Sequence, residues 1–224
     1  MIFRECKVIN ICFHGIGKPE RELQQDEAGY WIEPELYEET LDEVAHRTDV
    51  RISFDDGNRS DIEIGLPGLL RRGLTATFFA LAGRLGQRGS LSATDLRELR
   101  RHGMTIGTHG MDHLPWRGLD DQQTNRELVE ARLRLAEAAG TSITEAALPL
   151  GRYDRRVLGK LWALGYARVY SSDRIWTRAD AWLQPRYSIH NSDSIGTVRS
   201  RCLATPSALR SAKVAAVGLY KRTR

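Results

Sequence analysis

The segment Asp49-Val50-Arg51-Ile52-Ser53-Phe54-Asp55-Asp56-Gly57 is a short β-branched and apolar run that ends in two adjacent carboxylates and a glycine. Runs of this length, bounded by turn residues, predict β-strands. Six comparable runs occur elsewhere in the chain, at Lys7–His14, Thr75–Leu81, Met104–Thr108, Ala146–Leu150, Ala167–Ser171 and Tyr187–His190. The sequence therefore predicts seven strands.

Segments with helical spacing separate several of these strands, at Pro34–Arg47, Thr94–His102, Gln122–Ala139 and Arg155–Leu164. Glycines just past three of them, Gly103, Gly140 and Gly165, are expected to end the helices. Strands that alternate with helices predict an α/β protein with parallel strands. A closed (β/α) barrel and an open doubly wound sheet both satisfy this pattern, and both place functional residues at the carboxyl ends of the strands.

The length and composition are those of an ordinary single domain. The chain has 224 residues, of which 41% are hydrophobic and 28% charged. No stretch approaches the roughly 20 consecutive apolar residues of a membrane-spanning helix. The three cysteines are scattered, which excludes a disulfide framework, and Met1–Phe13 lacks the features of an export signal. We therefore expect a cytoplasmic protein.

The positive charge of the chain is concentrated at its end. Lys and Arg number 33 against 29 for Asp and Glu, which gives a formal net charge of +4. Seven basic residues and no acid follow from Arg199 onward, so the rest of the chain carries −3 and has no nucleic-acid-binding footprint. Residues 201–224 are expected to form a basic tail, with a helix over Ser207–Tyr220. That helix either packs on the main domain or rests weakly on an anionic membrane surface, such as the inner membrane face.

Three polar motifs stand at successive predicted strand ends. Asp55 and Asp56 follow the predicted strand that begins at Asp49. The repulsion between these paired carboxylates is offset most easily by a cation, although Asp-Asp-Gly is also a common turn. His109 and His113 follow another strand, at a spacing that suits metal ligation or arises by chance on a surface. Two imidazoles and one carboxylate would leave metal positions open for water and substrate. Pro149-Leu150-Gly151 follows the fifth strand and allows close backbone approach to a ligand.

Together these motifs resemble those of the polysaccharide deacetylases, the family that includes the chitooligosaccharide deacetylases. Ser53–Gly57 resembles their first motif, Thr108–His113 the second and Pro149–Gly151 the third, and the resemblance extends from about His14 to His190. It implies a distorted (β/α) barrel of about seven parallel strands, with a catalytic domain spanning residues 1–200. It also implies a metal-dependent hydrolase that removes an acetyl group from N-acetylated amino sugars.

The resemblance implies roles for individual residues. Asp56, His109 and His113 would bind one divalent metal, most often zinc, with cobalt, nickel and manganese as alternatives. Asp55 would be the general base that takes a proton from water. An N–H of the Pro149–Gly151 loop, by position that of Leu150, would share the developing oxyanion with the metal.

The sequence departs from the family pattern in two places. The arginine that usually opens the third motif is missing, because Ala147-Leu148 precedes Pro149, and Arg186 is expected to supply that guanidinium. The late Leu-x-His motif of the general acid is matched only by Ser188-Ile189-His190, with Asp173 to orient the histidine. His14 is a further candidate for the general acid, and its surroundings resemble an element of exopolysaccharide deacetylases.

The substrate is expected to be an N-acetylated oligosaccharide, polysaccharide or glycoconjugate. Trp116 would stack on a sugar ring or pack against the barrel rim, and Tyr153 extends the third motif toward the substrate. Two other functions stay open: hydrolysis of a non-sugar amide or imide on the same scaffold, and glycan binding without catalysis.

Overall fold

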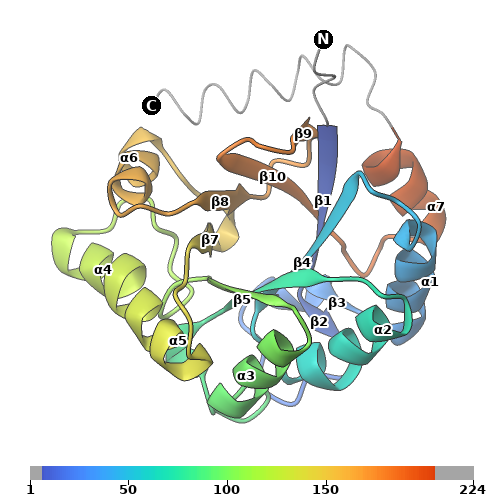
Figure 1. The fold of residues 1–224 in the computed structure, drawn as a ribbon, viewed down its shortest axis with the longest axis horizontal. Helices are drawn as coiled ribbons and strands as arrows, with labels where there is room; N and C mark the ends of the chain where they lie inside the picture. Colours follow the sequence, from blue (N-terminus) through green and yellow to red (C-terminus); the bar gives the residue numbers. More distant parts are fainter. Residues whose placement is uncertain (1–6, 205–224) are drawn as a thin grey trace.

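The computed structural model describes residues 7–204, and its centre is a closed barrel of seven parallel strands (Figure 1). The strands are β1 (Lys7–Phe13), β4 (Val50–Asp56), β5 (Ala76–Ala80), β6 (Thr105–Thr108), β7 (Glu145–Ala147), β8 (Arg168–Ser171) and β10 (Leu183–Ser188). They pair in this order, and β10 pairs with both β8 and β1, which closes the barrel. The hydrophobic pattern allowed both a closed barrel and an open sheet, and the structure is the closed barrel.

Two small additions flank the barrel. Strand β9 (Thr177–Arg178) pairs antiparallel with β1. Strands β2 (Gly15–Ile16) and β3 (Trp31–Ile32) form a separate parallel pair, with the 3₁₀ turn η1 (Glu27–Tyr30) before β3. The segment between β2 and β3 supplies residues to the pocket at the carboxyl end of the barrel.

Helices surround the barrel (Figure 1). They are α1 (Pro34–Val44), α2 (Leu66–Arg71), α3 (Ala93–Arg101), α4 (Asp121–Asn125), α5 (Ala131–Ala139), α6 (Arg155–Ala163) and α7 (Ile195–Thr197). The π-helical turns η2 (Asp61–Gly65), η4 (Arg126–Glu130) and η6 (Val198–Leu203) adjoin α2, α4 and α7, and 3₁₀ turns occur at η3 (Ala82–Arg84) and η5 (Pro149–Gly151). Because η4 links α4 to α5, the predicted helix over Gln122–Ala139 is continuous but contains a π-bulge.

The last barrel strand and helix α2 differ from the sequence-based expectation, and the short elements β2, β3, β9 and α7 were not predicted either. The last strand is Leu183–Ser188 and not Tyr187–His190, so His190 lies in the loop after it. The apolar pattern did not reveal the first part of this strand, because Gln184 and Arg186 are polar although both are buried. Helix α2 was not predicted, because Pro67 and Gly68 interrupt its sequence. Pro67 lies at the start of α2, directly after the π-helical turn η2, and a side chain at Gly68 would meet the Tyr37 ring at 2.6 Å.

The main hydrophobic core lies between the barrel and the helices. Ile9, Ile11 and Phe13 of β1 face this layer, whereas the alternating Asn10 and Cys12 belong to the buried network of Arg186 and Gln184. The barrel interior is therefore unusually polar, and Arg186 is its largest fully buried side chain. This arrangement brings a charged group directly beneath the carboxyl ends of the strands.

The tail predicted from residue 201 lies outside the described residues apart from its first four positions. Cys202 and Leu203 are in η6 and pack in the main core. Within residues 7–204, no helix combines the length and the apolar character that crossing a membrane requires.

Candidate metal and catalytic site

A pocket of about 640 Å³ opens at the carboxyl ends of the barrel strands. The strand ends and the loops after them contribute His14, Asp55, Asp56, His109, His113, Leu148, Leu150, Gly151, Arg152, Ser172, Arg186 and Ser188, and the segment before β3 contributes Gln24, Gln25, Asp26, Glu27 and Tyr30. The volume falls in the range of small-molecule sites, about 300–1,000 Å³. Most of the residues predicted from the three motifs therefore meet in one cavity.

Asp56, His109 and His113 converge in this pocket. The Oδ1 atom of Asp56 lies 3.7 Å from Nε2 of His109 and 3.6 Å from Nε2 of His113. The three residues together could hold a metal ion. The segment Gly110–Pro115 is a loop, so the two histidines reach one point across a loop rather than from a helical turn.

The hydrogen bonds of the two imidazoles orient them for metal binding. Nδ1 of His109 lies 2.9 Å from the carbonyl oxygen of Ala147, and Nδ1 of His113 lies 2.9 Å from Oε1 of Gln24. Because both partners are acceptors, each Nδ1 carries the proton and each Nε2 presents a lone pair in the neutral ring.

Asp56 provides the independent test of whether a cation fits. The residue is 1% exposed, and neither carboxylate oxygen has a hydrogen-bond partner within residues 7–204. A buried carboxylate without partners is costly unless a cation compensates it. Its φ of 76° is also a strained conformation for a residue other than glycine. The donor set of two nitrogens and one oxygen therefore fits a divalent metal.

Asp55 is held by Arg186 in a bidentate ion pair. Nη1 donates to Oδ1 at 2.6 Å and Nη2 donates to Oδ2 at 2.7 Å. Nη1 also reaches Ser53 Oγ at 3.1 Å and Cys12 Sγ at 3.3 Å. The guanidinium thus comes from β10, on the opposite side of β1 from β4, and holds the Asp55 carboxylate in a fixed orientation.

The site favours ionised carboxylates and a neutral imidazole. Burial alone would raise the pKa of Asp55, but Arg186 and His109 outweigh it and lower this pKa. The pKa of Asp56 is also lowered, because His113 and the other histidines outweigh burial. Burial lowers the pKa of His109 to about 4 despite the nearby Asp55. At neutral pH the site therefore holds proton acceptors and metal ligands in their active charge states.

The third motif forms the turn η5 on the pocket wall. Leu150 has a φ of 55° and is 55% exposed, whereas Pro149 is buried. A Cβ atom at Gly151 would lie 1.9 Å from Ser172 Oγ, so only glycine fits there. Tyr153 is fully buried and its hydroxyl bonds to Asp173, so its predicted contact with substrate is wrong.

The two candidate general acids lie in different surroundings. His14 lines the pocket, where its Nε2 is 4.0 Å from Asp55 Oδ2 and its ring stacks on Tyr30. Within residues 7–204, His190 is not among the residues that line the pocket, but its ring packs edge-on against Tyr30, on which His14 stacks, and its Nδ1 lies 2.9 Å from Ser192 Oγ. Asp173 accepts hydrogen bonds from Tyr153 and from Ser171.

Sequence reasoning missed the residues that support the histidine loop. Glu127, in the π-bulge η4, accepts hydrogen bonds from the N–H groups of Met111 and Asp112 at 2.8 and 3.0 Å. It also accepts one from the Trp116 indole at 3.3 Å. Trp116 is 2% exposed, so the packing alternative holds and sugar stacking on this residue is wrong. The only sequence signal was an acidic residue on the apolar face of a predicted helix.

Comparisons with known proteins agree with this fold. Residues 42–169 match the family described as Polysaccharide deacetylase. The Bacillus subtilis protein named "Putative polysaccharide deacetylase YxkH" is 29% identical over 127 residues, which are 57% of this chain and 46% of that protein. The chain thus matches about half the length of this relative.

Two solved structures show the same barrel. The polysaccharide deacetylase BC0361 from Bacillus cereus has a TM-score of 0.76 at 15% identity, over 88% of this chain and 69% of that one. The Streptococcus pyogenes deacetylase PplD, solved in complex with acetate, has a TM-score of 0.73 at 16% identity, over 88% and 98%. Because the family match spans more than half of the described sequence and the motifs meet in one pocket, the chain belongs to the polysaccharide deacetylase family.

Proposed function

We propose that the protein is a metal-dependent hydrolase that removes the acetyl group from N-acetylated amino sugars in an oligosaccharide, polysaccharide or glycoconjugate. The observation that carries this proposal is the juxtaposition of two groups in one pocket. Asp56 and the Nε2 atoms of two histidines face one point, and the ionised Asp55, held by Arg186, lies beside it.

Asp56, His109 and His113 would hold the metal. Their two nitrogens and one oxygen suit zinc, with cobalt, nickel or manganese as alternatives. A divalent cation bound there would supply a Lewis acid for the acetamide carbonyl and would lower the pKa of water.

Asp55 would accept the proton of the attacking water. Its ion pair with Arg186 keeps the carboxylate ionised, and the pair also fixes its direction. Leu150 of the η5 turn lines the same cavity, and its N–H would stabilise negative charge on the carbonyl oxygen, because Pro149 has no N–H and that of Gly151 donates to the Leu148 carbonyl oxygen.

His14 would donate a proton to the departing amine as the C–N bond breaks. It lines the pocket next to Asp55, and Tyr30 packs on one face of its ring. The matched pair His14→Gln and His190→Gln tests this assignment. We expect His14→Gln to lower kcat by about 10²–10⁴-fold with its metal content retained, and His190→Gln to stay near wild type. The reverse ranking would contradict it.

The activity itself is tested by acetate release from N-acetylglucosamine oligomers, compared with a panel of small amides and cyclic imides. Metal content is measured in parallel on wild type, on His113→Ala and on His102→Ala, whose exposed imidazole contacts Glu98. We expect His113→Ala alone to lose both metal and activity. Metal-replete wild type that binds the oligomers without releasing acetate would contradict the proposal, and cleavage of an imide in their place would reassign the substrate.

The cytoplasmic location and the weak membrane association of the tail stay predictions. Deleting residues from Ser207 onward and measuring binding to anionic liposomes tests the second: binding that the deletion leaves unchanged excludes the tail as the anchor.

A further inference from the structure

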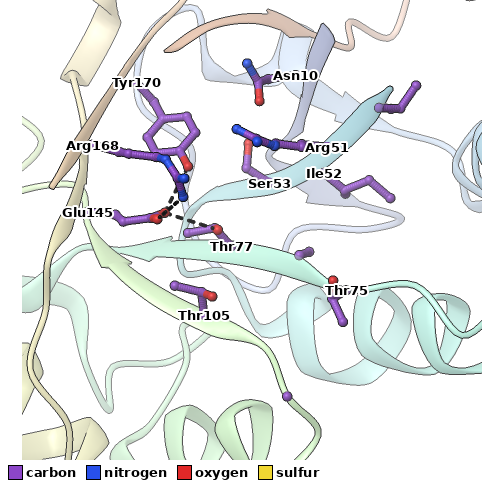
Figure 2. A pocket seen from close by; sticks show the side chains of 13 residues that line it. Asn10, Arg51, Ile52, Ser53, Thr75, Thr77, Thr105, Glu145, Arg168 and Tyr170 are labelled. Carbon is purple, nitrogen blue, oxygen red and sulfur yellow. Dashed lines mark hydrogen bonds and ion pairs between the residues drawn. The ribbon is translucent and has the colours of Figure 1, made fainter. Parts of the chain in front are cut away.

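A second cavity of about 290 Å³ lies at the amino ends of the barrel strands, opposite the catalytic pocket (Figure 2). The first residues of five strands line it, namely Val50 of β4, Ala76 of β5, Thr105 of β6, Glu145 of β7 and Arg168 of β8. Asn10, Arg51, Ser53, Thr77 and Tyr170 extend the lining into the barrel. None of these residues is in the catalytic pocket.

Two buried polar atoms in this cavity lack partners within residues 7–204. Asn10 is 1% exposed, and its Nδ2 donates to Gln184 and to the Pro185 carbonyl oxygen, but its Oδ1 accepts nothing. Arg51 donates from Nη2 to the Ala179 carbonyl oxygen, whereas its buried Nη1 donates to nothing. Figure 2 shows the Asn10 oxygen on the side of the Arg51 guanidinium. Buried donors and acceptors in native proteins are normally satisfied, so this pair indicates a missing partner.

The charges around the cavity favour an anion as that partner. Glu145 is its single carboxylate and is already engaged, because Tyr170, Arg168 and Thr77 reach its oxygens at 2.9, 3.3 and 3.4 Å. The cavity has two guanidinium groups, those of Arg51 and Arg168. Arg51 has no ion pair with any residue of the described range, so its charge is uncompensated. Guanidinium groups pair with carboxylate and phosphate oxygens through charge-assisted hydrogen bonds.

We propose that this cavity binds a small anion that also carries a hydroxyl group. The carboxylate or phosphate oxygens of the ligand bond to Nη1 of Arg51 and to the Arg168 guanidinium, and the ligand hydroxyl donates to Oδ1 of Asn10. The volume restricts the ligand to a small molecule, since it lies at the lower end of small-molecule sites.

The test is calorimetric titration of metal-free protein with glycolate, acetate and inorganic phosphate. Glycolate carries both groups, acetate lacks the hydroxyl, and phosphate distinguishes the two anionic groups. Anions could also bind to a metal in the catalytic pocket. Metal-free protein and the His113→Ala variant are used so that such binding is not mistaken for binding in the second cavity. Binding is the readout rather than turnover, because Ser53 lines this cavity and also accepts a hydrogen bond from the catalytic-site Arg186.

We expect saturable binding to wild type and to His113→Ala, with glycolate or phosphate bound more tightly than acetate. Arg51→Gln should weaken binding by about tenfold or more, and Arg71→Gln, on the exposed face of α2, should not. Arg168→Gln is the second variant, because Arg168 is half-exposed and its loss does not remove the Arg51 bond to Ala179. Three results would overturn the proposal: no saturable binding up to about 10 mM, unchanged binding in both arginine variants, or loss of binding in His113→Ala.

Discussion

Replacing Arg186 with methionine removes the partner of a buried carboxylate. Both side chains of the pair are almost inaccessible, 2% for Arg186 and 4% for Asp55, and two short hydrogen bonds join them. Breaking one side of such a pair costs about 3–5 kcal/mol. A domain is stable by only about 5–15 kcal/mol, so the free energy of unfolding of Arg186→Met should fall by a large fraction of the total.

The same substitution should change catalysis through the protonation of Asp55. Without Arg186, burial dominates and the pKa of Asp55 rises, so the carboxylate takes up a proton at a higher pH than in wild type. The acid limb of the kcat/KM profile should therefore move to higher pH. Near neutral pH the loss of the base should lower kcat by about 10²–10⁴-fold.

Chemical denaturation and pH-dependent acetate release measure both effects. The double variant Arg186→Met with Asp55→Asn should be more stable than Arg186→Met alone, because no uncompensated charge remains buried. Arg71→Met serves as the control for loss of an arginine at the surface. An Arg186→Met enzyme with wild-type turnover and an unshifted acid limb would refute the reasoning.

Three further changes test the site. Gln24→Leu removes the acceptor of His113 Nδ1, so metal affinity measured by chelator competition should fall by about 10–100-fold, and an unchanged affinity would show that the bond is dispensable. The pKa of His109 is lowered from 6.5 to about 4, so between pH 6.5 and 4 the unfolded chain binds a proton that the folded protein does not. The free energy of unfolding of the metal-free protein should therefore drop by about 3 kcal/mol as the pH falls from 6.5 to 4. Urea titrations check this, and His109→Gln should lack this component. Gly151→Ala should disrupt the η5 turn and lower kcat/KM, with partial recovery on adding Ser172→Gly, and normal kinetics of the single variant would be the contrary result.

The strand-end motifs could be predicted because they are local. Asp55 and Asp56 end β4, and His109 follows β6 directly, so the rule that functional groups gather at carboxyl ends was enough to place them in one pocket. The closed barrel was predicted through family resemblance, because hydrophobic periodicity is the same for an open sheet.

Contacts between distant segments could not be read from the sequence. Gln24 reaches His113 across 89 positions, and no local pattern marks it as a partner. Trp116 was expected either to stack on a sugar ring or to pack against the barrel rim, and Tyr153 was expected near substrate because it extends the third motif. Their polar atoms are satisfied inside the protein by Glu127 and Asp173. The burial of an aromatic side chain depends on tertiary packing, which the local sequence does not reveal.

The position of Arg186 makes completion of the site depend on β10, the last barrel strand along residues 7–204. Strand β10 joins β8 to β1, so the guanidinium meets Asp55 only when the seam of the barrel is sealed. Before that step the chain has a potential nucleophile-activating centre without its counter-charge. Without the guanidinium nothing fixes the direction of the Asp55 carboxylate, so the orientation of the proposed base depends on closure of the barrel.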